Sequence, residues 1–593
     1  MKKIINIEKK NCIAHLVTLI ILIAIALYRL FDKPGLWFAD EFGYAGTAAY
    51  LGGMDWAGQI KNIAYYGIGY GILLAPAYLL CNTSQQVIYY ANSLNLIMLI
   101  GVFELSVRFL KKLKQDEQSV LIIYLCSLLS TLYINNLVQL QLDWTETLNI
   151  FLSWLILNLL IDLLNENKLR TYILLSIFLC CMVIVHMRNI GIVVAACITL
   201  ALYLGITKRV RISQLISFII ISLVGIVLFF STKEFIQNTV WNNSASVAVN
   251  DIDSSIVKVK NAVMIDQIPK LISSVCCKFF YAIASSYGLL TLGLFLACKV
   301  ILEKEKNIIE RLVYLYIVLC FLFQLIIGSI SMMSPGRVDG GIYGRYFEHC
   351  IGALICLGIY SFGTEKVRSV RKNYFFIIII LVFCALIAHD KIRSFENSFN
   401  VYPCISGVGK YFAQKPILEE VTIQIVLETI LRMGIVLIVY LIIAKCKLEK
   451  ENVVRIMLFL PIVIICYSWV SDGRIVIDYM LKGEMKRYEN IDPISNTLEE
   501  YGYTFRMDKE LYYLTDYDEE WNEYLLGLQF RIGKNKLINI SYDDWDSILK
   551  NSPLFVIKRN IYANNDTDIM DSFADVYSPI SATSQFILYK YNG

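Results

Sequence analysis

Charged side chains are scarce in this chain of 593 residues: Asp, Glu, Lys and Arg together make up 18%, whereas hydrophobic residues make up 57%. A soluble protein of this size carries about 25% charged residues. The apolar residues are gathered in stretches of roughly 20, which is the length that an α-helix needs to cross a bilayer. The composition therefore excludes a soluble enzyme or a disordered scaffold and predicts a polytopic α-helical membrane protein.

Cysteine is absent after Cys466, and most of the 16 cysteines lie inside apolar stretches, where they act as small hydrophobic side chains. A disulfide-stapled module is therefore excluded, and because no C-x-x-C pair stands beside a histidine, no zinc site is expected. Clustered basic residues on a soluble face are also lacking, so nucleic acid is not expected as a partner. Lysines precede the first apolar run without a small-residue cleavage site, which predicts an uncleaved first span.

Thirteen apolar stretches are expected to span the membrane. They lie at about 12–30, 86–108, 118–138, 145–163, 170–187, 189–206, 212–231, 276–300, 311–333, 345–362, 374–389, 424–444 and 452–470. A further apolar stretch, 63–81, decides the sidedness. If it does not span and the N-terminus is cytoplasmic, seven basic segments fall on the cytoplasmic side, as the positive-inside rule requires. We therefore expect 63–81, with its three glycines and one proline, to be a helix in the outer interface.

This topology divides the chain into a transmembrane domain over 1–470 and a soluble extracytoplasmic domain over 471–593. The second domain is acidic, with 13 Lys and Arg against 21 Asp and Glu. Its apolar runs and the segments between them predict a small α/β domain. The expected strands are 511–514, 537–540, 554–557 and 586–589, and the expected helices are 519–530 and 543–549.

Acidic residues that could carry chemistry gather on the outer side. Asp40 and Glu41 follow the first span, where a low-dielectric interface raises the pKa of a carboxylate toward that of a general base for a hydroxyl nucleophile. Asp143 lies at the outer mouth of the fourth span. The alternative at both places is helix capping, which Asp at a helix start commonly provides. Glu146 stands at the capping-box spacing from Asp143.

Basic residues lie on the same side. His186 and Arg188 form a tight turn between two spans, where an arginine can either snorkel to the interface or bind a phosphate with its planar fork. Arg337 and Arg345 bracket a glycine-containing loop whose backbone N–H groups could approach an anion. An ordinary surface loop is the alternative. His349 is expected one helical turn after Arg345, at the head of a span.

The span centres, by contrast, are nearly free of charge. Glu348 and His349 enter the hydrocarbon region, where ionisable groups are costly and often functional. Glu428 and Arg432 lie four residues apart within a span and are expected to form a structural ion pair. A transporter would more often place ionisable groups at the midplane and show inverted repeats. The pattern favours an enzyme working at the outer membrane surface.

The order of these motifs resembles that of the GT-C-type, polyprenyl-phosphate-sugar-dependent glycosyltransferases, in the branch of protein O-mannosyltransferases and aminoarabinose transferases. The resemblance covers about residues 12–363. Asp40-Glu41 matches the family's acidic pair, 65–80 its interfacial helix, and Asp143 its second acid. Arg188-Asn189 matches the turn between spans five and six, and Arg345-Tyr346 matches a later Arg-Tyr pair. The chain departs from the family at Gly69-Tyr70, where Pro-Pro is usual, and at Arg188-Asn189, where Lys-Gly is usual.

The resemblance implies a GT-C-like fold and inverting transfer of a sugar from a polyprenyl-phosphate donor to an extracytoplasmic glycan, lipid or protein. Arg188, Arg337, Arg345 and Tyr346 would hold the donor phosphate, and Asp40 would deprotonate the acceptor hydroxyl. Retaining the charge of the leaving phosphate in a basic pocket would supply the electrostatic part of catalysis.

Glu41 and Asp143 complete the catalytic set that the resemblance implies, with His186 and His349 as auxiliary residues. No metal ligand is assigned, although a divalent cation could bind Glu41, Asp143 and His349, and relatives differ in whether they need one. Two other functions remain open. The chain could be a flippase or transporter of a lipid-linked saccharide, or a polysaccharide polymerase or ligase.

Overall fold

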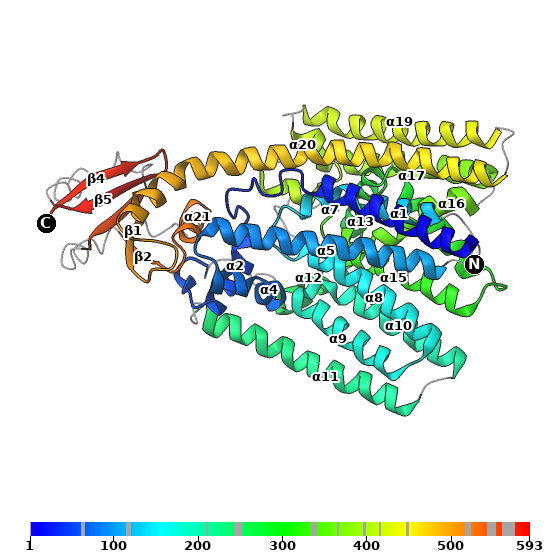
Figure 1. Cartoon of the computed structure of the whole chain (residues 1–593), viewed down its shortest axis with the longest axis horizontal. Coiled ribbons are helices and arrows are strands. Elements are labelled where there is room, and N and C mark those ends of the chain that lie inside the picture. The colour runs from blue at the N-terminus through cyan, green and yellow to red at the C-terminus, as the bar shows by residue number, and fades with distance from the viewer. Residues whose placement is uncertain are drawn as a thin grey trace.

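The computed structural model describes residues 2–60, 66–113, 120–208, 211–241, 252–333, 341–364, 367–394, 399–413, 417–445, 450–515, 523–541, 553–559 and 576–593. These residues form a long bundle of helices with a small sheet at one end (Figure 1). The expected fold class, a polytopic helical protein with a C-terminal α/β portion, is confirmed.

The apolar runs form the helices of the bundle, because a backbone in lipid must satisfy its hydrogen bonds within its own segment. In chain order these helices are α1 (Lys2–Ala26), α5 (Ser84–Leu113), α6 (Val120–Thr131), α7 (Ile134–Gln139), α8 (Glu146–Glu166), α9 (Leu169–Val185), α10 (Ile190–Thr207), α11 (Ile212–Phe235), α13 (Ile268–Ser285), α14 (Leu289–Leu302), α15 (Ile308–Ser331), α16 (Gly352–Thr364), α17 (Val367–Arg393), α19 (Leu418–Lys445) and α20 (Lys450–Glu500). Among the described residues, nine helices are long and apolar enough to cross a membrane, and six shorter apolar helices accompany them. The chain is a multi-pass membrane protein.

Two expected spans are broken. The stretch 118–138 divides into α6 and α7, and the stretch 276–300 divides into α13 and α14. The second break is a turn in which Tyr287 and Gly288 have positive φ angles of 48° and 76°. This left-handed backbone ends α13 and redirects the chain into α14.

The expected span 345–362 is helical only from Gly352, where α16 begins, and the 3₁₀ turn Glu348–Cys350 (η4) precedes it. Arg345 and His349 are therefore not one helical turn apart on a span, as the sequence had predicted. Both side chains are buried, so the surrounding protein encloses this non-helical segment.

Short helices lie between the spanning helices. They are α2 (Ala39–Leu51), α3 (Ala57–Ile60), α4 (Ile68–Leu80), η1 (Met187–Asn189), η2 (Ile236–Val240), α12 (Ile252–Ala262), η5 (Phe399–Cys404) and α18 (Lys410–Ala413). Figure 1 shows α2 and α4 at the end of the bundle that faces the sheet. With 13 residues, α4 is about 20 Å long, shorter than the hydrocarbon core. The helix α16 has the same length, so length does not assign 68–80 to the interface, and residues 63–65 lie outside the described ranges.

The helix α20 joins the bundle to the sheet. It has 51 residues and extends beyond the bundle in Figure 1, so that the expected boundary at residue 471 lies inside it. The elements after it are β1 (Glu510–Thr515), α21 (Glu523–Ile532), β2 (Lys536–Ser541), β3 (Phe555–Arg559), β4 (Tyr577–Ala582) and β5 (Phe586–Tyr591). The four expected strands are confirmed, and β4 is an addition that the sequence had not indicated. Residues 543–549 lie outside the described ranges.

The sheet has the order β2-β1-β3-β5-β4. The strands β2, β1 and β3 are parallel, with α21 connecting β1 to β2, whereas β5 pairs antiparallel with β3 and β4. Apolar side chains of the sheet and of α21 form one buried cluster with Tyr488, Ile491, Ile494 and Leu498 of α20. The sheet therefore packs directly on the outer end of the longest helix.

Candidate active site

The helix α2 carries the acidic pair, and its two carboxylates have different roles. Its N-cap is Phe38, not Asp40. Glu41, at the third helical position, accepts hydrogen bonds from the backbone N–H groups of Trp37 at 2.9 Å and Phe38 at 3.0 Å. Glu41 thus satisfies two backbone donors that a helix start would otherwise leave unpaired. Glu41 therefore caps the start of α2, and the Asp40 carboxylate is not used for capping.

Glu41 also belongs to a closed charge cluster. Its Oε1 accepts from the Lys33 ammonium and, at 2.8 Å, from the backbone N–H of Asp143. Lys33 Nζ lies 3.2 Å from Asp143 Oδ2. The exposures of Lys33, Glu41 and Asp143 are 1%, 0% and 1%. Two carboxylates therefore share one ammonium in a space that solvent does not reach.

Burial and the neighbouring charges leave the pKa values of Lys33 and Asp143 above their ordinary values. Burial alone would lower the pKa of Lys33. The carboxylates of Asp143 and Glu41 raise it by more than burial lowers it, so the pKa lies above its ordinary value. Burial raises the pKa of Asp143 above its ordinary value, although Lys33 opposes this. Lys33 is therefore charged at neutral pH, and it holds the two acidic segments together.

Asp40 points into a different environment. Its Oδ1 accepts a hydrogen bond of 2.5 Å from the Tyr66 hydroxyl, and its Oδ2 accepts from Arg345. The Asp40 side chain is 24% exposed, whereas that of Glu41 is fully buried. Of the two adjacent acids, only Asp40 can therefore meet a substrate without rearrangement of the fold.

Arg345 connects Asp40 to a second acid, Glu146. Arg345 Nε donates to Glu146 Oε1 at 2.5 Å, and Arg188 donates to both oxygens of the same carboxylate. The order Asp40–Arg345–Glu146–Arg188 alternates in sign. We call these four residues the charge chain. Because Glu146 binds two guanidinium groups, it does not form the capping box with Asp143, and the N-cap of α8 is Thr145.

Aromatic rings fix the two guanidinium groups. Arg345 lies over the ring of Trp144, 3.7 Å from its centroid, and Arg188 lies 4.9 Å from the centroid of Tyr346. Such stacking holds the planar fork in one orientation and suits the recognition of phosphate. Among the described residues, Arg345 Nη2 and Arg188 Nε have no hydrogen-bond acceptor. Each guanidinium therefore keeps one donor to offer to a ligand.

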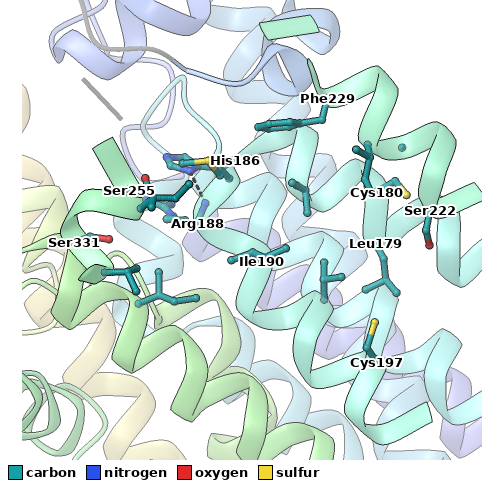
Figure 2. Close-up of a pocket in the computed structure, with 18 of the residues that line it drawn as sticks. Leu179, Cys180, His186, Arg188, Ile190, Cys197, Ser222, Phe229, Ser255 and Ser331 are labelled. Carbon is teal, nitrogen blue, oxygen red and sulfur yellow. Dashed lines mark hydrogen bonds between the residues drawn. The ribbon is translucent and has the colours of Figure 1, made fainter. Parts of the chain in front are cut away.

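A large apolar cavity reaches the charge chain at Arg188. Its volume is about 1030 Å³, and its walls come from α9, α10, α11, α12 and α15. Figure 2 shows His186 and Arg188 at one end, with Leu179, Ile190 and Cys197 along its length. Tyr346 also lines it. Lys258 and Lys260 of α12 and a few serines also line it. A mostly apolar cavity of this size with cationic groups in its wall suits a long hydrophobic ligand with an anionic head.

The remaining predicted residues are placed as follows. His186 lines the cavity and accepts the backbone N–H of Arg188 through Nδ1 at 3.3 Å. His349 is buried beside a separate cavity of about 30 Å³, and neither ring nitrogen has a partner among the described residues. Glu348 accepts from the hydroxyls of Tyr133 at 2.9 Å and Tyr281 at 2.6 Å. Arg337 lies outside the described residues.

Three residues of the site were not predicted as functional: Lys33, Glu146 and Tyr66. Lys33 precedes the acidic pair, and its position past the end of a span could have marked it, because a lysine there needs either solvent or an acid. Glu146 was considered only as a capping partner of Asp143. Tyr66 carries no sequence signal beyond its place in an aromatic, glycine-rich stretch.

The charge cluster does not fit a divalent metal. The Lys33 ammonium binds both Glu41 and Asp143, where a cation would need to bind. Across the described ranges, no group of three or more His, Cys, Asp or Glu side chains is arranged to hold a metal ion. The set Glu41, Asp143 and His349 considered from the sequence therefore does not form a site in this structure.

Comparison with solved structures identifies the fold. ArnT from Cupriavidus metallidurans bound to undecaprenyl phosphate superposes with a TM-score of 0.51 and 10% sequence identity, over 97% of both chains. The fold is of the GT-C type. ArnT from the same organism in the apo state gives a TM-score of 0.46 and 12% identity, over 96% of this chain and 97% of that one. No family model and no curated protein matches the sequence. The likeness in fold covers the C-terminal sheet as well as the helices, and it does not single out one member.

Proposed function

We propose that this protein is a membrane glycosyltransferase that moves a sugar from a polyprenyl-phosphate donor to a hydroxyl group of an extracytoplasmic acceptor. The observation that carries this proposal is the meeting of the apolar cavity with the charge chain at Arg188. A polyprenyl tail fits the cavity, and its phosphate would then lie beside Arg188, Arg345 and Tyr346. The solved ArnT structure, which contains undecaprenyl phosphate, supports the same class of lipid.

The charge chain suits a reaction in which negative charge moves from a base to a leaving group. Asp40 takes the proton of the acceptor hydroxyl, and the hydroxyl oxygen forms a bond to the anomeric carbon of the sugar. The bond between that carbon and the phosphate oxygen breaks, and attack opposite to the leaving group inverts the configuration. Once Asp40 is protonated, Arg345 loses an anionic partner and can compensate the additional charge on the leaving polyprenyl phosphate.

Glu41 and Asp143 have no direct part in this proposal. Lys33 binds both of them away from solvent, so their role is to hold α2 against the start of α8 and thereby to place Asp40. His186 lines the cavity beside the phosphate position and is an auxiliary residue of the donor site. His349 remains a candidate auxiliary residue, because its ring nitrogens keep the capacity for a hydrogen bond.

We propose that the N-terminus faces the cytoplasm and that the charge chain and the sheet lie on the outer side. The excess of basic residues in the loops opposite to the sheet supports this orientation. Reporters fused after Leu113 and after Glu500 test it. A cytoplasmic signal at the first and an external signal at the second are expected. The reverse pair would overturn the orientation, either because α4 spans or because the N-terminus is external. Two signals on the same side would mean that an even number of crossings separates the two reporters.

The direct test of the function is sugar transfer by the purified protein in detergent micelles. Labelled polyprenyl-phosphate sugars are offered one at a time with extracts that contain candidate acceptors. Transfer without sealed vesicles supports the glycosyltransferase. Movement of lipid-linked sugar across vesicle membranes without transfer would support a flippase instead. Use of polyprenyl-diphosphate oligosaccharides with no use of monophosphate sugars would support a polymerase or ligase.

A further inference from the structure

The segment that precedes Asp40 is held by the outer end of α20. Arg487 Nη1 donates to the carbonyl oxygen of Trp37 at 2.8 Å, and the Tyr488 hydroxyl donates to the carbonyl oxygen of Leu36 at 3.0 Å. The Arg487 guanidinium also stacks over the Trp37 ring, 3.5 Å from its centroid. Two consecutive residues of α20 thus satisfy two consecutive carbonyl groups of the loop.

The loop is fitted closely to this helix. A Cβ atom added at Gly35 would lie 2.1 Å from the ring of Tyr488, so a residue with a side chain cannot occupy this position unless the ring moves. Arg487 and Tyr488 are 5% and 1% exposed. The contact between residues 35–37 and α20 is therefore dry and allows little movement.

The C-terminal domain holds Arg487 in turn. Glu523, at the start of α21, forms an ion pair with Arg487. Tyr488 packs in the buried cluster that joins α20 to the sheet. Further contacts tie the domain to the neighbouring outer helices: the Trp56 indole N–H donates to the Gly533 carbonyl at 2.7 Å. The domain thus packs directly against residues 35–37 and the neighbouring helices.

A short covalent path connects these contacts to the charge chain. Trp37, whose carbonyl binds Arg487, donates its own N–H to Glu41. Asp40 lies three residues after Trp37 and directly before Glu41. A shift of the Trp37 peptide therefore moves the first turn of α2 and with it the Asp40 carboxylate.

We propose that Arg487 and Tyr488 are positioning residues for Asp40, through which the C-terminal domain forms part of the active-site scaffold. The inference rests on the proposed function, in which Asp40 is the base. The C-terminal domain would then affect the chemical step, although no residue of its sheet lies in the site. Neither residue touches the apolar cavity, so donor binding does not depend on them.

The test compares full-length variants in detergent: Arg487→Ala, Arg487→Lys and Tyr488→Phe. Lys536→Gln is the matched control, because Lys536 makes an exposed domain contact with Asp55, 2.8 Å away, that does not reach residues 35–37. Three quantities are measured: kcat at saturating donor, binding of unlabelled polyprenyl phosphate, and hydrogen exchange of the peptide 36–42.

Displacement of a catalytic group by about 1 Å can cost about 100-fold in rate. We expect a kcat loss of that order for Arg487→Ala, a smaller loss for Arg487→Lys, and a loss of about threefold to tenfold for Tyr488→Phe, which removes one hydrogen bond. Polyprenyl phosphate binding stays within about twofold, and exchange of 36–42 becomes faster in proportion to the kcat loss. Lys536→Gln matches the wild type.

The proposal is overturned if a folded Arg487→Ala keeps its kcat, or if it loses lipid binding and kcat together. If Arg487→Ala does not fold, Tyr488→Phe decides the question, and unchanged kcat with unchanged exchange overturns the proposal. Absence of sugar transfer by the wild type would instead refute the proposed function. In that case the exchange of 36–42 still shows whether Arg487 and Tyr488 hold the loop.

Discussion

Two charge clusters lie next to each other, and each contains one of two adjacent residues of α2. Glu41 joins Lys33 and Asp143 in a cluster without solvent access, whereas Asp40 enters the charge chain with Arg345. In the first cluster one cation, Lys33, pairs with two acids, and the buried carboxylate of Glu484 in α20 lies near all three. The charge chain has two cations for two acids.

The difference separates structural from functional charge. Lys33 binds only protein groups, and its cluster joins the first outer loop to the start of α8. In the charge chain, each guanidinium keeps an N–H without an acceptor among the described residues, and Arg188 reaches the apolar cavity. Charge that is buried and pairs only with protein groups holds segments of a fold together. Charge that keeps free donors next to a cavity can bind a ligand.

Neutralising the two adjacent acids one at a time should produce the largest difference between the two clusters. Asp40→Asn keeps the shape of the side chain and removes its basicity, and loss of a general base costs about 10²–10⁴ in rate. We expect kcat at saturating donor to fall in that range, with little change in donor binding. Glu41→Gln is the matched variant, and it should keep kcat within about tenfold.

The same two substitutions should affect thermal stability in the opposite order, with Glu41→Gln the more destabilising. Glu41→Gln leaves Lys33 with one acid instead of two, so its thermal midpoint in detergent should fall below that of Asp40→Asn. A Glu41→Gln variant that is stable but inactive, beside an active Asp40→Asn, would reverse the assignment of the base. Full activity in both variants would remove α2 from the chemistry.

Lys33→Met should be the most destabilising change in the buried cluster. Removal of one partner of a buried ion pair leaves uncompensated charge and costs about 3–5 kcal/mol. The thermal midpoint in detergent measures the loss. Lys536→Gln is the control, because its exposed ion pair with Asp55 contributes less than about 1 kcal/mol. A Lys33→Met protein as stable as this control would show that the cluster does not hold the loop to α8.

The sequence was sufficient to predict the fold class. Apolar stretches and basic loops follow from the physics of the bilayer, so their positions predict most of the helices. Breaks within a span, as at Tyr287 and Gly288, depend on packing between helices and leave little trace in the sequence. The helix α20 continues past residue 471 because its C-terminal part packs against the sheet.

The order of the motifs predicted Asp40, Arg188 and Arg345 on the same side. In the structure Arg345 binds Asp40 directly, and Arg345 and Arg188 both bind Glu146. The sequence could not tell Asp40 from Glu41 by composition, since the direction of each side chain depends on where α2 begins. The pairing of Lys33 with Asp143 was equally hidden, because the two residues are 110 positions apart in the chain. Long-range pairing of charge is the part of a site that a single sequence does not reveal.

Glu146→Gln tests whether the charge chain is complementary to a phosphate. The change removes the anion that two buried guanidinium groups share, and the loss of charge-assisted hydrogen bonds costs about 1.5–3 kcal/mol. The variant should have a lower thermal midpoint than the wild type. Added polyprenyl phosphate should then raise the midpoint more in the variant than in the wild type, because the lipid supplies the missing anion.

Lys33→Met is the matched comparison for this rescue, since its cluster has no opening to the cavity. Polyprenyl phosphate should raise its midpoint no more than that of the wild type. Equal rescue of both variants would mean that the lipid stabilises the bundle in general and does not bind at Arg188 and Arg345.

The smallest effect is expected for Arg345→Lys, which keeps the charge and changes only its geometry. Arg345 bridges Asp40 and Glu146 while it stacks on Trp144, and a lysine ammonium cannot make a planar, two-sided contact of this kind. Loss of about one charge-assisted hydrogen bond should raise the donor KM about tenfold, with the fold intact. Arg29→Lys is the control, because Arg29 pairs with Asp32 and Asp478 away from the cavity, and its donor KM should equal that of the wild type. Unchanged donor kinetics in Arg345→Lys would show that Arg345 does not bind the donor phosphate. Among the arginines in the described part of the site, that role would then fall to Arg188, at the end of the cavity.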